Sequence, residues 1–198
     1  MQIIRLRIVL SVAFAISLPS IAWAQPIDDP VECGRAQFEK QPEYKVVLFE
    51  HFLTSLSDPS VRFLGDNEMT ANLVPIVGKC AEHLTDEQEQ LAILALGIVG
   101  DQMLIEGRQR LRELKFDSSR FDDLFLPALR DMPLDALNLL TFRPPDELRE
   151  PAFALRDEII EQSGKSKEEV TSLLIAYTTG LVGVEASRRV VAELSETP

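Results

Sequence analysis

Apolar residues recur at spacings of three and four along most of this chain, and this periodicity restricts the possible fold more than any other feature. The clearest run is Tyr44, Val47, Leu48, Phe52 and Leu56. Such spacings place side chains on one face of an α-helix, whereas a half-buried strand requires alternation. The chain also has no Asn-Gly or Asp-Gly dipeptide that would indicate a tight β-hairpin. We therefore predict an all-α protein, a single-domain irregular bundle of about six to eight helices.

A long helix is expected in the middle of the chain. Thr85 and Gln88 have the spacing of a capping box, in which each side chain bonds the free backbone N–H of the other residue. The predicted helix begins at Thr85 and continues towards Leu114. Because glycine weakens a helix, Gly97 and Gly100 leave two possibilities, one long helix or two shorter ones.

Other local signals predict further boundaries. Ser166 and Glu169 repeat the capping-box spacing, so a last helix is expected to begin there. Residues 68 to 84 are expected to be helical with a kink or a restart at Pro75, which lacks the N–H of a regular helix. Residues 25 to 32 contain two prolines and three acidic residues, and we expect them to be extended.

Two glycine pairs occur inside apolar stretches, Gly97 with Gly100 and Gly180 with Gly183. Glycine within a helix costs about 1 kcal/mol relative to alanine, so these pairs need a compensating gain. Residues three apart share a helix face, and the absence of side chains there lets another backbone approach closely. We interpret the four glycines as the place where two central helices cross. The alternatives are a glycine-lined groove for an apolar ligand or peptide, and a hinge.

The first 24 residues have the pattern of a secretory signal peptide. Arg5 and Arg7 precede an apolar stretch and the small-x-small sequence that ends at Ala24. The alternative is an uncleaved membrane anchor, but the uninterrupted apolar run is shorter than the roughly 20 residues that cross a bilayer. We therefore expect cleavage after Ala24 and a single helical domain over residues 25 to 198, located in the periplasm or secreted.

The chain has two cysteines, Cys33 and Cys80. In an oxidising compartment such a pair favours one intramolecular disulfide, which for a loop of this length stabilises the fold by about 4 kcal/mol. A reactive pair or a metal site would show a Cys-x-x-Cys motif or further clustered ligands. The sequence shows neither, so we predict a structural bridge between Cys33 and Cys80.

Acidic residues outnumber basic ones by 32 to 20, for a formal net charge of −12. The predicted signal peptide contains two arginines and no acidic residue, so cleavage would make the chain more acidic still. Nucleic acids and anionic lipids are polyanions that bind through lysine and arginine, so both are disfavoured as partners. Stable membrane insertion after processing is not expected either. The uncharged stretch from residue 170 to 184 spans only about 22 Å as a helix.

Candidate catalytic groups are few. His51 and His83 each follow a glutamate, but neither belongs to a His-Glu-x-x-His motif, so we interpret both as surface or partly packed side chains. Asp117, Asp122 and Asp123 are close in sequence, and helix N-termini favour such acids without any catalytic role. We assign no catalytic residue, no metal ligand and no cofactor.

Residues 33 to 80 consist of a cysteine, a helical stretch and a second cysteine preceded by Pro75-Ile76-Val77. This outline resembles that of small disulfide-bridged periplasmic acid-stress chaperones and that of periplasmic immunity proteins that neutralise secreted cell-wall amidases. The resemblance covers about a quarter of the chain and implies a helical protein that binds other proteins. The residues after Cys80 depart from the chaperone pattern, so the resemblance assigns no functional residue.

These observations predict an exported, soluble, all-helical protein without enzymatic activity that binds another envelope protein or a small apolar ligand. The alternative is a periplasmic hydrolase whose carboxylates converge in a cleft, because such a pair forms only in three dimensions. A deep cleft with two convergent carboxylates would favour the hydrolase, and a broad apolar surface would favour the binding protein.

Overall fold

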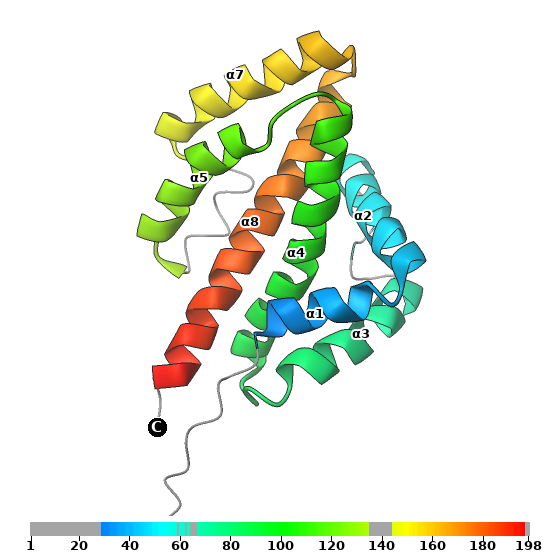
Figure 1. Ribbon diagram of the computed structural model, residues 1–198, viewed down its shortest axis with the longest axis vertical. Coiled ribbons are helices and arrows are strands. Elements are labelled where there is room, and N and C mark those ends of the chain that lie inside the picture. The colour runs from blue at the N-terminus through cyan, green and yellow to red at the C-terminus, as the bar shows by residue number, and fades with distance from the viewer. Residues whose placement is uncertain (1–28, 59, 62, 64–66, 135–143, 197–198) are drawn as a thin grey trace, which may run out of the picture.

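The computed structural model describes residues 29–58, 60–61, 63, 67–134 and 144–196, and within them it contains seven helices and no strand (Figure 1). In chain order the helices are α1 (Pro30–Phe38), α2 (Pro42–Ser57), α3 (Asn67–Ala81), α4 (Gln88–Glu113), α5 (Ser119–Asp131), α7 (Asp146–Ser163) and α8 (Lys167–Glu196). Over these residues the all-α prediction is confirmed, as is the predicted number of helices. The predicted signal peptide and its cleavage site after Ala24 lie outside the described residues.

Helices α4 and α8 form a central antiparallel pair (Figure 1). Glycine makes their close approach possible. A Cβ atom on Gly97 would lie 2.2 Å from the Cβ atom of Ser187, and one on Gly180 would lie 2.6 Å from the carbonyl oxygen of Gly100. Because atoms do not approach so closely, a larger residue at either position would force the helices apart. Despite its glycines, α4 is one unbroken helix of 26 residues.

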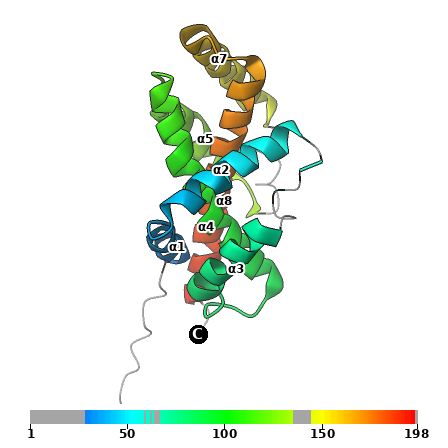
Figure 2. The same ribbon diagram turned by 90° about the vertical axis from the view of Figure 1, so that its right-hand side faces the viewer.

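Helices α1 and α3 pack together against the first half of α4 (Figures 1 and 2). A disulfide joins Cys33 in α1 to Cys80 in α3, which confirms the predicted bridge. Arg35 of α1 donates two hydrogen bonds, of 2.9 and 2.7 Å, to the carboxylate of Asp101 on α4. Helix α1 is therefore held covalently on one side and by an ion pair on the other.

Helices α5 and α7 cover the opposite side of the central pair (Figure 1). The Tyr177 hydroxyl of α8 donates to Asp122 of α5 at 2.6 Å and accepts from Arg108 of α4 at 3.1 Å. Burial and the hydrogen bond to Asp122 raise the pKa of Tyr177, which keeps its hydroxyl a proton donor. Arg189 of α8 donates to two carbonyl oxygens at the end of α5. Polar contacts therefore link α4, α5 and α8.

One prediction about local structure before α4 is wrong, and of the two alternatives at Pro75 the restart is excluded. Residues 25 to 32 were expected to be extended, but α1 begins at Pro30. The Asp29 carboxylate caps this helix by accepting a hydrogen bond of 2.8 Å from the N–H of Val31, and proline fits a first helical turn. Helix α3 continues through Pro75 as one helix and does not restart there.

The predicted start of α4 is also wrong, because Thr85 and Gln88 do not form a capping box. The helix begins at Gln88 and has no side-chain cap. The Thr85 hydroxyl instead accepts from the N–H of Glu87 at 3.1 Å and donates to the side-chain oxygen of Gln90 at 2.6 Å. These bonds stabilise a polar turn in place of a first helical turn.

Helices α4 and α8 are each long and apolar enough, by length and composition, to cross a membrane. Within the molecule 61% of the apolar stretch of α4 and 67% of that of α8 are buried. The central helix of a protein core and a membrane-spanning helix share this composition. Packing of α4 against α8 therefore accounts for the apolar sequence of both helices.

Candidate functional site

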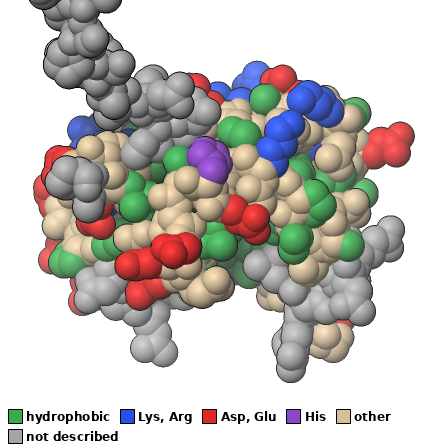
Figure 3. Space-filling model, turned by 90° about the horizontal axis from the view of Figure 1, so that it is seen from below, with side chains coloured by type: hydrophobic (Ala, Val, Ile, Leu, Met, Phe, Trp, Pro, Cys, Tyr) green, Lys and Arg blue, Asp and Glu red, His purple; other side chains and the backbone are tan. Residues whose placement is uncertain are grey.

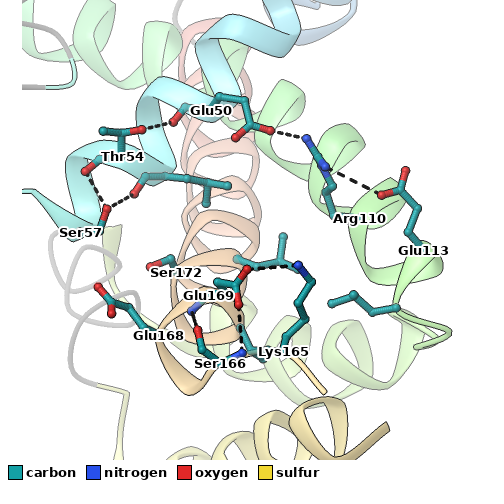
Figure 4. Close-up of a pocket in the computed structure, with 14 residues that line it drawn as sticks. Glu50, Thr54, Ser57, Arg110, Glu113, Lys165, Ser166, Glu168, Glu169 and Ser172 are labelled. Carbon is teal, nitrogen blue, oxygen red and sulfur yellow. Dashed lines mark hydrogen bonds and ion pairs between the residues drawn. The ribbon is translucent and has the colours of Figure 1, made fainter. Parts of the chain in front are cut away.

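An open pocket of about 640 Å³ lies between α2, α4 and α8 (Figure 4). The second half of α2, the end of α4 and the start of α8 form its walls. The lining residues are Glu50, Leu53, Thr54, Ser57, Arg110, Glu113, Leu114, Lys165, Ser166, Glu168, Glu169, Val170, Ser172 and Leu173. Three segments that are far apart in the chain therefore meet at this pocket.

Four apolar side chains line the pocket and are called here the apolar floor: Leu53, Leu114, Val170 and Leu173. Val170 and Leu173 are buried, and the other two are half-buried. Val170 and Leu173 lie on the same face of α8 because they are three residues apart. An apolar group that covers this floor gains about 25 cal/mol for each Å² of apolar surface removed from water.

Charged side chains surround the apolar floor (Figure 4). Arg110 of α4 pairs with Glu50 of α2 and lies 3.9 Å from Glu113 on its own helix. Lys165 pairs with Glu169 at 3.1 Å. These five side chains are 43% to 56% exposed, so water screens the pairs, and each contributes about 0 to 1 kcal/mol. A bound molecule can therefore replace one of these partners without a large loss of stability.

The start of α8 forms the acidic side of the pocket. The N–H of Ser166 donates to Glu169 at 3.0 Å, and the N–H of Glu169 donates to the Ser166 hydroxyl at 3.2 Å, so this predicted capping box is confirmed. The bond from the Ser166 N–H and that from Lys165 lower the pKa of Glu169. Glu168 has no hydrogen bond or ion pair with the described residues. With four carboxylates and two cations, the pocket attracts positive charge.

The four glycines singled out from the sequence lie between α4 and α8 and do not line the pocket. A Cβ atom on Gly183 would lie 2.6 Å from the carbonyl oxygen of Leu96, and one on Gly100 would lie 3.0 Å from that of Gly180. Atoms of the partner helix already fill the space beside each glycine. The arrangement is that of two helices in direct contact, with Gly97 at the same interface.

Neither histidine lines the pocket. His51 of α2 is half-buried, and its ring lies 6.2 Å from that of Phe63, measured between centroids. His83 is exposed after the end of α3. Within the described residues no group of three His, Cys, Asp or Glu side chains could hold a metal ion.

The aspartates that are close in sequence do not converge on the pocket either. Asp117 accepts a hydrogen bond of 3.0 Å from the N–H of Ser119, at the start of α5. Asp122 accepts from Tyr177 and pairs with Arg108 at 3.2 Å. Both carboxylates therefore stabilise local structure or helix packing.

The residues that define the pocket are not evident from the sequence. Glu50 and Arg110 are 60 residues apart in the chain, and no motif connects them. Lys165 and Glu168 lie beside Ser166 and Glu169, the two residues of the capping box. Helix N-termini favour acidic residues such as Glu168 even where there is no binding site. The one available signal was the capping box of Ser166, which located the start of α8 but not its neighbours.

Comparison of the chain with protein-family models, with curated proteins and with solved structures finds no match. The fold and the pocket alone therefore define its class. It is an all-α protein with a disulfide between α1 and α3 and an open, acid-rich pocket between α2, α4 and α8.

Proposed function

We propose that this chain is an exported, non-enzymatic binding protein of the cell envelope, and that its partner binds at the pocket between α2, α4 and α8. Three features support the proposal: the signal-peptide pattern of residues 1 to 24, the disulfide, and the pocket itself. The pocket is the main support for a binding function, because the signal-peptide pattern and the disulfide indicate only the compartment.

The pocket has the size and composition of a binding site. Its volume of about 640 Å³ lies within the range of ligand-binding clefts, roughly 300 to 1,000 Å³. An apolar floor with polar groups at its edge is the usual arrangement in such clefts, since apolar contact supplies affinity and polar contact supplies orientation. Most of its polar lining residues are exposed and accessible to a partner.

The alternative of a hydrolase has less support from this geometry. A general acid needs a pKa near the working pH, which burial of the carboxyl group usually provides. The side chains of Glu50 and Glu113 are 51% and 53% exposed, and both face Arg110. The pKa of Glu169 is lowered, which is the wrong direction for a proton donor at neutral pH. These carboxylates are better suited to pair with cations of a partner.

Affinity capture with a pocket variant tests the proposed function. Thr54 is exposed at the pocket, and Thr54→Trp would fill part of it without changing the core. Ser195→Trp, exposed at the far end of α8, is the matched control. We expect an envelope protein that is recovered with the wild-type chain and with Ser195→Trp but lost with Thr54→Trp. No partner for the wild-type chain, or a partner that Thr54→Trp retains, would contradict the proposal.

A further inference from the structure

We propose that the partner presents a basic amphipathic helix, whose apolar side chains cover the apolar floor and whose lysines or arginines pair with the acidic residues around it. The inference deepens the proposed function and rests on it. It follows from three observations: an unpaired carboxylate at the pocket, two exposed valines on α2, and the length and position of α2.

The first observation is the charge that remains after the internal ion pairs are formed. Arg110 and Lys165 are already paired with Glu50 and Glu169. Glu168 has no partner among the described residues, whereas Glu113 accepts a hydrogen bond of 3.3 Å from Gln109 and lies 3.9 Å from Arg110. Glu168 is therefore the carboxylate at the pocket that a cation of the partner can bind without displacing an internal contact. An anionic partner would meet these carboxylates and would have to displace an existing pair to reach either cation.

The second observation is that the binding surface continues beyond the pocket. Glu43, Val47, Glu50, Thr54 and Ser57 are spaced by four, three, four and three residues, so they share one face of α2. The last three of them line the pocket. Val47 is 52% exposed, and its neighbour Val46 is 42% exposed. Val46 and Val47 therefore add exposed apolar surface about one turn before Glu50, with the acidic side chains of Glu43 and Glu50 beside it.

The third observation is the length and position of α2. It crosses the outer side of the α4 and α8 pair (Figure 2). Its 16 residues correspond to about 24 Å of helix, which matches four to five turns of a partner helix. By contrast, at the end of the molecule seen in Figure 3 the apolar side chains of the described residues are scattered among polar ones.

These observations favour a basic protein segment over a small cation. A small cation would neutralise Glu168 but leave Val46, Val47 and the apolar floor in water. Lysine and arginine side chains carry aliphatic stems that cover apolar surface while their charged ends reach carboxylates. An amphipathic helix in an apolar groove is a recurrent mode of recognition between proteins.

A synthetic probe tests the inference directly. The probe is a helical peptide of about 18 residues with leucine on one face, lysine on the other and one tryptophan on the leucine face. The full chain carries Trp23→Phe, which removes its single tryptophan, so that all tryptophan emission comes from the peptide. We expect a blue shift of the emission and saturable binding. A peptide with glutamate in place of lysine should not bind.

Two variants with the same change of charge separate the pocket from the general acidity of the chain. Glu168→Lys lies at the pocket, whereas Glu150→Lys lies on the exposed face of α7. We expect the first to weaken binding of the lysine peptide by about tenfold, and the second to change it by less than about twofold. Circular dichroism and thermal unfolding verify that both variants fold, as expected for exposed positions.

Equal losses in the two variants, or equal binding of the lysine and glutamate peptides, would overturn the inference. An absence of any emission shift would do the same. If the lysine peptide fails while an envelope partner is still lost with Thr54→Trp, the basic-helix inference is wrong but the proposed function stands. If no variant of the pocket affects any partner, both are wrong.

Discussion

The guanidinium of Arg35 covers the carboxylate of Asp101, and the two groups form bonds of 2.7 and 2.9 Å between α1 and α4. The pair is asymmetric, because the Asp101 side chain is 7% exposed and that of Arg35 is 46% exposed. A buried carboxylate that loses its partner retains the cost of its desolvation. The stability of the α1 contact should therefore depend on this one arginine.

Replacement of Arg35 tests this dependence. We expect Arg35→Met to lower the free energy of unfolding by about 2 kcal/mol, because the buried carboxylate of Asp101 loses both bonds from the guanidinium and keeps only the 3.5 Å bond from Gln102. Arg149→Met is the matched control, since Arg149 is exposed to a similar degree but its partner Asp146 is 86% exposed. The control should lose less than about 0.5 kcal/mol in urea unfolding. Equal losses would mean that burial of Asp101 has no energetic consequence.

The space beside each glycine predicts opposite effects of alanine at Gly180 of α8 and Gly78 of α3. In Gly180→Ala the new Cβ atom would lie 2.6 Å from the backbone oxygen of Gly100, which cannot move independently. We expect a loss of about 2 kcal/mol or more. In Gly78→Ala of α3 the Cβ atom would meet the flexible end of Glu82 at 3.3 Å. Because alanine also favours the helix, that variant should be neutral or more stable in thermal unfolding.

Reduction of the disulfide should destabilise the chain without changing its fold class. The bridge joins residues 47 apart, and a loop of this size corresponds to about 4 kcal/mol of unfolded-chain entropy. The double variant Cys33→Ser and Cys80→Ser should unfold at lower urea than the oxidised wild type. Addition of a reductant should shift the wild type to the same midpoint and leave the variant unchanged. A wild-type midpoint that does not respond to reductant would show that the bridge adds no stability.

Acid should weaken the start of α8 through Glu169. Its pKa in the folded chain is lowered from 4.5 by the Ser166 N–H and by Lys165. The ionised form is therefore the stabilising one, and its contribution is complete above pH 4.5 and lost as the pH falls through the folded-state pKa. Glu169→Gln should accordingly show a shallower fall of unfolding free energy below pH 4.5 than the wild type. Glu168→Gln, which removes a neighbouring carboxylate that has no partner among the described residues, is the matched control for the loss of one charge.

Local signals were sufficient where the decisive bonds join residues close in the chain. Ser166 and Glu169 satisfy each other three residues apart, so the start of α8 followed from sequence alone. Thr85 and Gln88 have the same spacing but form no box, because the Thr85 hydroxyl bonds to Gln90 instead. A capping pattern therefore predicts a helix in this region, while competition among nearby polar groups decides the first residue.

The sequence by itself determined the helical class of the protein and the two cysteines that could pair, because helical periodicity and cysteine number are properties of the chain. Only the tertiary structure decided where a partner could bind. The pocket requires Glu50, Arg110 and Glu168 to meet, and their positions depend on how α2 lies across α4 and α8. That arrangement results from packing of whole helix faces, which individual residues do not encode locally.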